Sequence, residues 1–295
     1  MDGTNGTEAT PRPVLYVSPH PDDAVFSAGG SIARDVAAGR RVRVVTVFSD
    51  TGPGTGREIE DRDAVSSLGA ELVVLGFSDA PLRHPRHRRL RGLFEPLQES
   101  DGGLVDRVTD ALAAHAAAET EIIGPLGVGE HVDHQIAHAA CMALRGRFPV
   151  QFYEDVPYAL CDYAVARRLA RLGGGAGYAR ASRTRELWAW AQFWGEKPVL
   201  ERYASRWPVP LRGASMALAQ LDRWQPSGTA PWQEERVAVG DYLDAKLAAI
   251  GAYCTQWPLF YASLAEWRQA FLDYAKTLGA RAALERRWHC SAASP

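Results

Sequence analysis

The sequence predicts an α/β fold, Rossmann-like, with a mainly parallel sheet covered by helices on both faces and a mostly helical C-terminal extension. Short runs of β-branched and apolar residues alternate with segments of helical spacing throughout the first half of the chain. Such repeated β-α units are typical of a buried parallel sheet. The second half has a different composition, because all nine tryptophans lie at or after Trp188.

The individual elements follow from hydrophobic spacing and from the residues that end each segment. Apolar runs predict strands at 14–18, 41–48, 71–75 and 121–124. Helical spacing predicts helices at 24–38, 57–68, 104–118 and 134–144, and later at 241–253 and 264–278. The first two helices end at Gly39 and Gly69, and glycine is the residue that most often ends a helix.

Length and composition set the broad class of the protein. The chain has 295 residues, of which 46% are hydrophobic and 23% charged, enough for a full globular core. A formal net charge of −2 gives no general attraction to nucleic acid. We find no apolar run of transmembrane length and no secretory signal, so we expect a cytoplasmic protein without a membrane span. The four cysteines form no CxxC pair, which predicts free thiols.

The chain divides into three parts. Residues 1–12 are polar and predict a disordered tail, residues 13–180 hold the α/β core, and residues 181–295 predict a helical, Trp-rich extension that packs on the core. The glycine-rich stretch at 173–177 is typical of a hinge or loop. We expect the aromatic residues of the extension to serve packing more than ligand stacking.

Ligands of parallel α/β sheets bind in the loops that follow the carboxyl ends of the strands. Four such loops are expected here, at 19–23, 49–56, 76–83 and 125–133. All four open on the same edge of the sheet, so their polar residues should gather there. The loop at 49–56 is rich in glycine, but no GK[ST] follows it, which favours a flexible active-site loop over a phosphate loop.

Two polar clusters in these loops predict a bound divalent cation. His20, Asp22 and Asp23 directly follow the first strand, and the segment His131-Val132-Asp133-His134 follows a glycine-rich approach. Adjacent carboxylates and imidazoles are costly to desolvate unless a cation compensates them. A catalytic zinc takes three nitrogen or oxygen ligands and keeps one position for water, and the remaining carboxylate and histidine suit a general base and a general acid. Either cluster alone also fits a polar loop with capping aspartates.

The two clusters resemble the motifs of the PIG-L/LmbE-like deacetylases over about residues 13–158. The first motif is Ser18-Pro19-His20-Pro21-Asp22-Asp23 with Gly29-Gly30 after it, and the second is the PLGVGEHVDH run that ends at His134. The family includes N-acetylglucosaminyl-phosphatidylinositol deacetylase and the deacetylases of mycothiol, bacillithiol and antibiotic pathways. The resemblance therefore implies that residues 13–180 form a metal-dependent deacetylase core.

The resemblance also assigns chemical roles. One Zn²⁺ per chain, or another divalent metal, would be held by His20, Asp23 and His134. Asp22 would be the general base, and His131 would be the general acid that protonates the leaving amine. Asp133 would orient a histidine from outside the ligand set.

Four further residues are expected to contact the substrate. Arg57 matches a substrate-binding arginine of the thiol-pathway members, and Asp79 falls near an acidic residue that contacts sugar hydroxyls there. Those members carry a tyrosine two residues before the general-acid histidine, where this chain has Gly129. A mycothiol-type substrate is therefore disfavoured. Tyr153 and Tyr158 are candidates to line the pocket.

The expected function is zinc-dependent removal of an acyl group, acetyl in the leading hypothesis, from the nitrogen of a small amino-sugar-like or specialised-metabolite substrate. N-acetylglucosamine derivatives and antibiotic precursors are the substrates that the family suggests. Three alternatives remain: an amidase that cleaves a thiol conjugate, an inactive sugar-binding protein, and a nucleotide-binding protein, although GxGxxG is missing. The five arginines between Arg83 and Arg91 are either a solvated loop or a basic lid for an anionic substrate. The sequence leaves open whether the protein forms a homo-oligomer.

Overall fold

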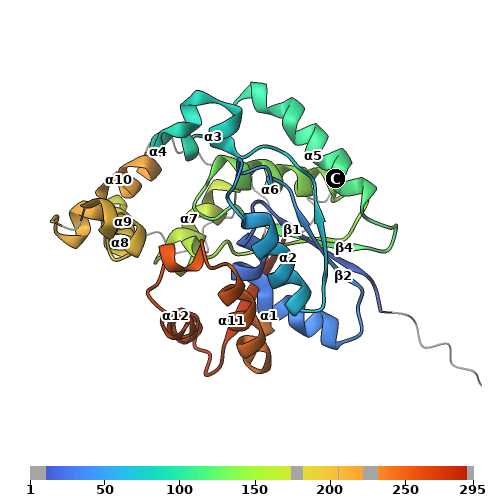
Figure 1. Cartoon of the computed structure of the whole chain (residues 1–295). Helices are drawn as coiled ribbons and strands as arrows, with labels where there is room; N and C mark the ends of the chain where they lie inside the picture. Colours follow the sequence, from blue (N-terminus) through green and yellow to red (C-terminus); the bar gives the residue numbers. More distant parts are fainter. Residues whose placement is uncertain (1–10, 174–181, 205, 222–231, 291–295) are drawn as a thin grey trace, which may run out of the picture.

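The computed structural model describes residues 11–173, 182–204, 206–221 and 232–290. Most of the expected tail at 1–12 and of the glycine-rich stretch at 173–177 lies outside these ranges. One seven-stranded sheet runs through the centre of the molecule in the order β3-β2-β1-β4-β5-β7-β6 (Figure 1). Its strands are β1 (Val14–Ser18), β2 (Val42–Thr46), β3 (Glu71–Val74), β4 (Glu121–Pro125), β5 (Val150–Tyr153), β6 (Trp232–Ala238) and β7 (Leu284–Cys290).

β1 to β5 pair with one another in parallel, and the sequence predicts the first four of these strands but not β5. β1 lies in the middle, with Tyr16 opposite Val44 of β2 on one side and Ile123 of β4 on the other. All five residues of β1 are buried. The strand order reverses direction between β1 and β4, and in open α/β sheets such a point creates the ligand-binding crevice.

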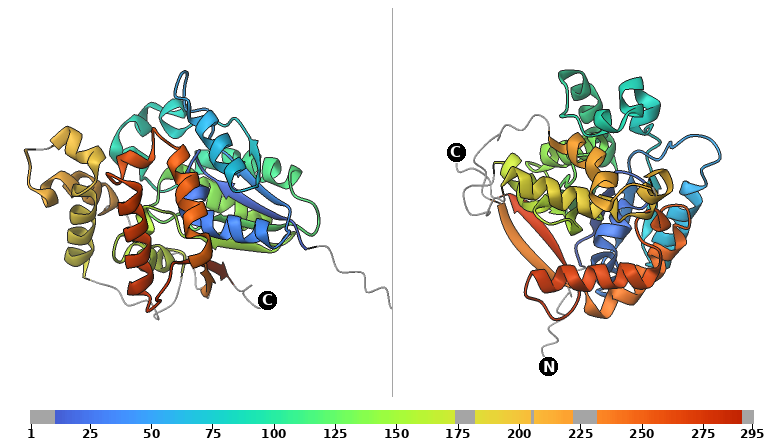
Figure 2. Two further views of the ribbon diagram at one scale, coloured as in Figure 1. Left: turned by 60° about the horizontal axis from the view of Figure 1, so that its bottom comes forward. Right: turned by 90° about the vertical axis from the view of Figure 1, so that its left-hand side faces the viewer.

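Helices cover both faces of this sheet. On one face α5 (Gly102–Ala114) packs against α6 (Val132–Leu144), and on the other α11 (Leu243–Ala252) packs against both α1 (Asp23–Ala37) and α2 (Arg57–Ser67) (Figure 2). The expected helices of the first half therefore form within a few residues of their expected bounds, although α6 begins two residues earlier, at Val132. The remaining helical segments are α3 (Ala80–Arg83), α4 (Leu90–Leu93), α7 (Ala164–Arg171), α8 (Arg183–Gly195), α9 (Pro198–Ala204), α10 (Val209–Leu221), α12 (Leu264–Thr277) and the 3₁₀ turns η1 (Pro85–Arg88), η2 (Glu99–Asp101), η3 (Tyr158–Leu160), η4 (Gly240–Tyr242) and η5 (Trp257–Leu259).

The C-terminal third adds two strands that the sequence pattern does not reveal. β7 pairs antiparallel with both β5 and β6, so the sheet continues beyond the parallel core. β7 contains the buried charged residues Glu285 and Arg287. Glu285 pairs with Lys246 at 2.8 Å, and Arg287 pairs with Asp35 at 3.2 Å. Because paired charged residues occupy part of the buried face of β7, this strand lacks the alternation of apolar and polar residues by which a strand is recognised in a sequence.

The Gly29-Gly30 pair of α1 is where the C-terminal third contacts the core most closely. A side-chain Cβ on Gly30 would lie 2.7 Å from the Cβ of Val239. Both carboxylate oxygens of Glu285 accept backbone hydrogen bonds here, from Gly30 N at 3.0 Å and from Ser31 N at 2.8 Å. Glycine is thus required by the close approach of two chain segments, and α1 is held in place directly behind the loop that follows β1.

Two expectations from composition can be compared with the described ranges. Their cysteines are all free thiols, as expected, and only Cys254 is exposed. No helix in these ranges is both long and apolar enough to cross a membrane.

Candidate active site

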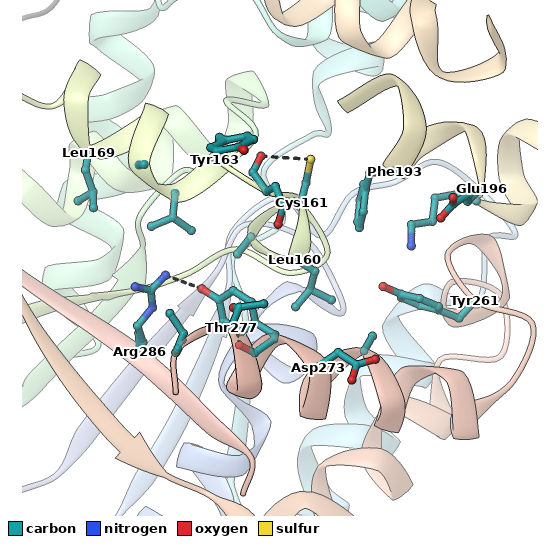
Figure 3. Close-up of a pocket in the computed structure, with 18 of the residues that line it drawn as sticks. Leu160, Cys161, Tyr163, Leu169, Phe193, Glu196, Tyr261, Asp273, Thr277 and Arg286 are labelled. Atoms are coloured by element: carbon teal, nitrogen blue, oxygen red, sulfur yellow. Dashed lines mark hydrogen bonds between the residues drawn. The ribbon is translucent and has the colours of Figure 1, made fainter. Parts of the chain in front are cut away.

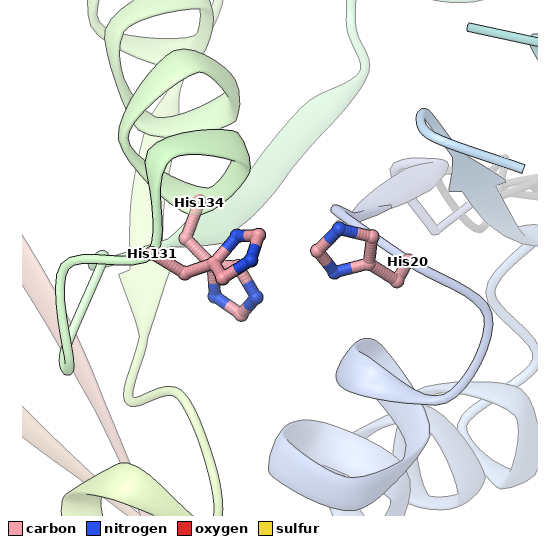
Figure 4. A group of neighbouring side chains, drawn as sticks. All are labelled: His20, His131 and His134. Carbon is pink, nitrogen blue, oxygen red and sulfur yellow. The ribbon is translucent and has the colours of Figure 1, made fainter. Parts of the chain in front are cut away.

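The polar clusters after β1 and β4 meet at the crevice between these two strands. His20 lies in the loop that leaves β1, and His131 and His134 lie at the start of α6, which follows β4. Figure 4 shows the ring of His20 facing the other two imidazoles. One nitrogen of each of the three rings lies within 4.8 Å of the others. The topology therefore brings together residues that are more than one hundred positions apart in the sequence.

Asp23 places one carboxylate oxygen between two of these histidines. Its Oδ2 atom lies 3.0 Å from Nδ1 of His20 and 3.2 Å from Nε2 of His134. All three side chains are buried. The pKa of Asp23 lies well below its usual value, because the two histidines outweigh the opposing effect of burial.

The other nitrogen of each histidine meets a second buried carboxylate. Nε2 of His20 lies 3.0 Å from Oδ2 of Asp133, and Nδ1 of His134 lies 2.7 Å from Oδ1 of Asp155. If each of these nitrogens donates its proton to its carboxylate, Nδ1 of His20 and Nε2 of His134 present lone pairs toward Asp23. Carboxylates placed in this way behind the ligands are typical of histidine metal sites, and separations of 3.0–3.2 Å suit ligands of a single small cation.

Backbone and side-chain donors hold both of the outer carboxylates in position. Asp155 accepts hydrogen bonds from the backbone N–H groups of Gly127 at 2.7 Å and Val128 at 2.8 Å. Asp133 accepts the N–H of Ala80 at 3.0 Å and pairs with the guanidinium of Arg83. A second group of possible ligands, His20 with Asp79 and Asp133, is a weaker candidate because these contacts already occupy both oxygens of Asp133.

Asp22 differs from its neighbour Asp23 in both backbone and electrostatics. Its φ angle is +114°, a strained value for a residue other than glycine, and it marks the start of α1. Burial raises the pKa of Asp22 to about 7, against the attraction of Arg57. Arg57 donates to Oδ2 of Asp22 at 3.2 Å and to the carbonyl of Pro21 at 2.9 Å. A carboxyl group with a pKa near 7 is well matched to proton transfer at neutral pH.

His131 occupies the N-cap position of α6, where its Nδ1 atom accepts the backbone N–H of Asp133 at 3.3 Å. This contact places the proton of the neutral ring on Nε2. Burial and the two neighbouring histidines lower the pKa of His131 to about 3, against the opposing effect of Asp133. His131 is therefore a neutral imidazole with an N–H donor.

A cavity of about 220 Å³ opens over these residues. His20, His131, His134 and both of the adjacent aspartates line it, together with Arg57, Asp79, Tyr158, Gln256 and Phe260. Asp79 also lies 3.4 Å from Nε2 of His20 through its Oδ1 atom. Tyr153, expected at the pocket, does not line this cavity: it is buried, and its hydroxyl donates to the carbonyl of Val17 at 2.8 Å. Tyr153 ends β5, so its side chain turns into the sheet interior.

Tyr158 fills the space beside Gly129. A Cβ atom on Gly129 would lie only 2.3 Å from Cγ and from Cδ1 of the Tyr158 ring. Gly129 also has a φ angle of +85°, which other residues rarely adopt. The same tyrosine ring packs edge-on against His134 at 5.9 Å between ring centroids. An aromatic ring from η3 therefore stands next to the position where a side chain on Gly129 would otherwise project.

Part of the chain matches a known protein family. Residues 15–144 match the PIG-L family, described as GlcNAc-PI de-N-acetylase. The α/β core of the chain therefore contains a region similar to the PIG-L family. This finding agrees with the resemblance seen in the two sequence motifs, both of which lie inside the matched residues.

Two curated relatives of this chain are deacetylases of amino sugars. The 2'-N-acetylparomamine deacetylase of Streptomyces fradiae is 35% identical over 166 residues, which cover 49% of this chain and 57% of the relative. The 1D-myo-inositol 2-acetamido-2-deoxy-alpha-D-glucopyranoside deacetylase of Mycobacterium sp. (strain KMS) is 29% identical over 181 residues, covering 53% of this chain and 58% of the relative. The chain thus matches less than two thirds of the length of either relative.

The fold of nearly the whole chain is similar to solved structures. A deacetylase of the teicoplanin biosynthesis pathway, in a complex with bog, has a TM-score of 0.62 at 20% identity and covers 95% of this chain and 99% of its own. A zinc-inhibited form of teicoplanin deacetylase has a TM-score of 0.60 at 19% identity, with coverage of 95% and 99%. At this identity the likeness establishes the fold, including the C-terminal third.

The structure also places residues in this candidate site that sequence reasoning missed. Asp155 has no role in the sequence prediction because it follows β5, a strand that the pattern did not reveal. Arg83 belongs by sequence to the basic segment at 83–91, yet it contacts Asp133, and its guanidinium carbon lies 4.7 Å from the centroid of the Phe48 ring. Phe260 comes from the C-terminal third, and no motif signals its position in the cavity.

Proposed function

We propose that this protein is a zinc-dependent N-deacetylase that hydrolyses the acetamido group of a small amino-sugar-like substrate. The observation that carries the proposal is the convergence of two imidazole nitrogens on one oxygen of Asp23, beside a second carboxylate whose pKa is about 7. The deacetylase activities of the curated relatives support the reaction class.

The donor set suits a single divalent cation. His20, Asp23 and His134 would hold it, and Asp133 and Asp155 would fix the orientation of the two histidines. Two nitrogen ligands and one oxygen ligand are a common set for catalytic zinc, and another divalent metal is the alternative. When bound, such an ion polarises the acyl carbonyl and lowers the pKa of water.

The two catalytic side chains then divide the proton transfers. Asp22 takes a proton from the water whose oxygen attacks the carbonyl carbon of the amide. Asp22 passes this proton to His131, and the imidazolium so formed donates a proton from Nε2 to the amide nitrogen as the C–N bond breaks. His131 returns to its neutral form, so one water is consumed and an amine and a carboxylic acid are formed. Asp22 is buried and His131 is half-buried, which limits the access of bulk water to these transfers.

The cavity walls favour a sugar-like substrate. Asp79 offers a carboxylate to sugar hydroxyl groups, and Tyr158 and Phe260 offer ring faces to the sugar's apolar side. Arg57 lines the cavity, and because it also contacts Asp22, we assign it two functions: contact with the substrate and control of the charge on the base. Both curated relatives act on acetylated amino sugars, one of them of the paromamine type. A precursor of an antibiotic is therefore a reasonable substrate class.

The test is a panel of N-acetyl amino sugars, free, glycoside-linked and nucleotide-linked, with release of free amine as the measurement. A thiol-conjugate amide and an unacetylated sugar complete the panel. Turnover of at least one acetylated sugar, lost in Asp22→Asn, supports the proposal. Turnover of the thiol conjugate alone would favour the amidase alternative. Binding of sugars with no turnover, in a metal-loaded protein, would favour the sugar-binding alternative and overturn the enzymatic proposal.

A further inference from the structure

A second cavity, of about 450 Å³, lies behind the turn that carries Tyr158. It is lined by residues in or next to η3, α7, α8, α12 and β7, and Figure 3 shows its lining residues around the space between these elements. Its volume falls in the range of known small-molecule sites. Aliphatic side chains form much of its wall: Leu160, Val165, Ala166, Leu169 and Leu278. The proposed mechanism uses none of these residues.

Lys197 brings a positive charge into this cavity. The residue is only 4% exposed, and its Nζ atom lies between two aromatic rings, 4.0 Å from the centroid of Phe193 and 3.7 Å from that of Tyr261. No hydrogen bond or ion pair joins Nζ to any residue that the structure describes. Cation–π contacts compensate only part of the desolvation of a buried ammonium group, so its three N–H donors remain available for an anion.

The other charged groups of the cavity are already paired or exposed. Arg286 is neutralised by Glu154 at 2.8 Å and by Glu234 at 3.3 Å. Glu196 and Asp273 are exposed, and each accepts a hydrogen bond from a neighbour on its own helix or at its end. Lys197 is therefore the single buried charge without an ionic partner among the described lining residues, and the acidic groups near the opening disfavour a ligand with two negative charges.

We propose that this cavity is an accessory binding site for a small aliphatic carboxylate, whose carboxylate group pairs with Lys197 and whose chain packs along the aliphatic wall. One free ammonium group matches one carboxylate charge. Burial lowers the pKa of Lys197 to about 8, so the charged form still predominates at pH 7. The site is separate from the proposed catalytic centre, since Tyr158 faces that centre and the adjacent Ala159 lines this cavity.

The experiment is a calorimetric titration of the full chain at pH 7 with octanoate and with 1-octanol, its uncharged counterpart. Octanoate should bind more tightly than octanol. Lys197→Met keeps the length of the side chain but removes its charge, and it should weaken octanoate binding at least tenfold while leaving octanol binding unchanged. Arg62→Met, at an exposed position on α2, is the matched control and should bind octanoate like the unmodified protein.

A second variant separates this cavity from the catalytic centre, where a carboxylate could also bind a metal. Ala166→Phe fills the cavity wall without touching the catalytic residues, and it should abolish binding of both octanoate and octanol. Octanoate binding that survives Ala166→Phe belongs to the catalytic centre and overturns the proposal. Equal octanoate affinity in the unmodified protein and in Lys197→Met also overturns the proposal. Lys197 would then serve only to pack between the rings of Phe193 and Tyr261. The titrations need no turnover, so they stand or fall independently of the deacetylase assay.

Discussion

The ring of Tyr158 occupies the space into which a side chain on Gly129 would project. The two residues lie 29 positions apart in the sequence and come from different connections, one after β4 and one after β5. By the motif resemblance, thiol-pathway deacetylases carry a tyrosine where this chain has Gly129. The structure shows that a tyrosine ring is nevertheless present beside this position and against His134.

This relationship predicts a strong coupling between the two residues. Gly129→Ala should lower stability by about 1–2 kcal/mol from its positive φ angle alone, and by more because Cβ would collide with the Tyr158 ring. Removing the ring in the double variant Gly129→Ala/Tyr158→Ala should relieve the collision but not the φ strain. Melting temperatures of both single variants and the double variant measure the coupling. Gly146→Ala, where a Cβ meets no atom within 4 Å, is the control. Additive effects would show that the ring moves away at no cost.

Asp155 should be a positioning residue for the proposed metal ligand His134. In Asp155→Asn the amide oxygen can satisfy the backbone N–H groups of Gly127 and Val128, which turns the NH₂ group toward Nδ1 of His134. The proton of His134 would then move to Nε2, the atom that faces Asp23. Zinc affinity should fall about 10- to 100-fold, as expected when the carboxylate behind a histidine ligand is lost.

The measurement for Asp155→Asn is a zinc titration of the metal-free protein, with stability followed in parallel. Glu154→Gln is a matched control, because Glu154 is also buried but pairs with Arg286 and Trp288 on the other side of the strand. It should lose stability without losing zinc affinity. Equal zinc affinity in Asp155→Asn and the unmodified protein would remove Asp155 from the site.

Variants of the basic segment at 83–91 can test whether the substrate is anionic. Arg88 and Arg89 are exposed, and Arg86 is only loosely paired, with Asp101 at 3.5 Å. If these charges attract the substrate, replacing all three by Ser should lower kcat/KM several-fold at low salt, and the loss should shrink at high salt. A triple variant with unchanged kinetics at low ionic strength would identify the segment as a solvated loop. Arg83 is left intact, since it holds Asp133.

The sequence predicted those parts of the fold whose burial is apolar. β1 to β4 and their helices show clear periodicity, because apolar side chains cover their buried faces. β7 was missed because Glu285 and Arg287 are buried through ion pairs, which leave no apolar alternation to detect. β6 pairs only with β7 and was missed with it. The expected boundary at residue 180 stays a prediction, although the sheet continues across it.

The same reasoning explains which site residues could be foreseen. His20, Asp23 and His134 lie in compact motifs after predicted strands, so topology alone implied that they meet. Asp155 contacts the backbone of the loop at Gly127 and the side chain of His134. Both contacts join residues that are distant in the sequence, so no local sequence motif reveals them. The sequence does not indicate which of Tyr153 and Tyr158 lines the cavity. The answer depends on where β5 ends, because Tyr153 is its last residue and is buried in the sheet.

Asp22 and Asp23 should have separable roles. Asp23 places its Oδ2 atom between two histidines, whereas Asp22 contacts Arg57 and has a pKa raised to about 7 by burial. Asp22→Asn keeps the shape of the side chain and removes only its basicity. It should therefore retain the metal while kcat falls by about 10² to 10⁴, the usual contribution of a general base.

Asp23→Asn should instead lose the metal, because a neutral amide is a poor zinc ligand. Excess zinc should partly restore activity to Asp23→Asn but not to Asp22→Asn. Metal content and kcat, measured for both variants across a zinc titration, distinguish the two roles, and chelation of the unmodified enzyme should abolish turnover. Loss of metal from Asp22→Asn together with its retention in Asp23→Asn would reverse the assignment. Full activity in a protein with an empty site would exclude a metal-dependent mechanism.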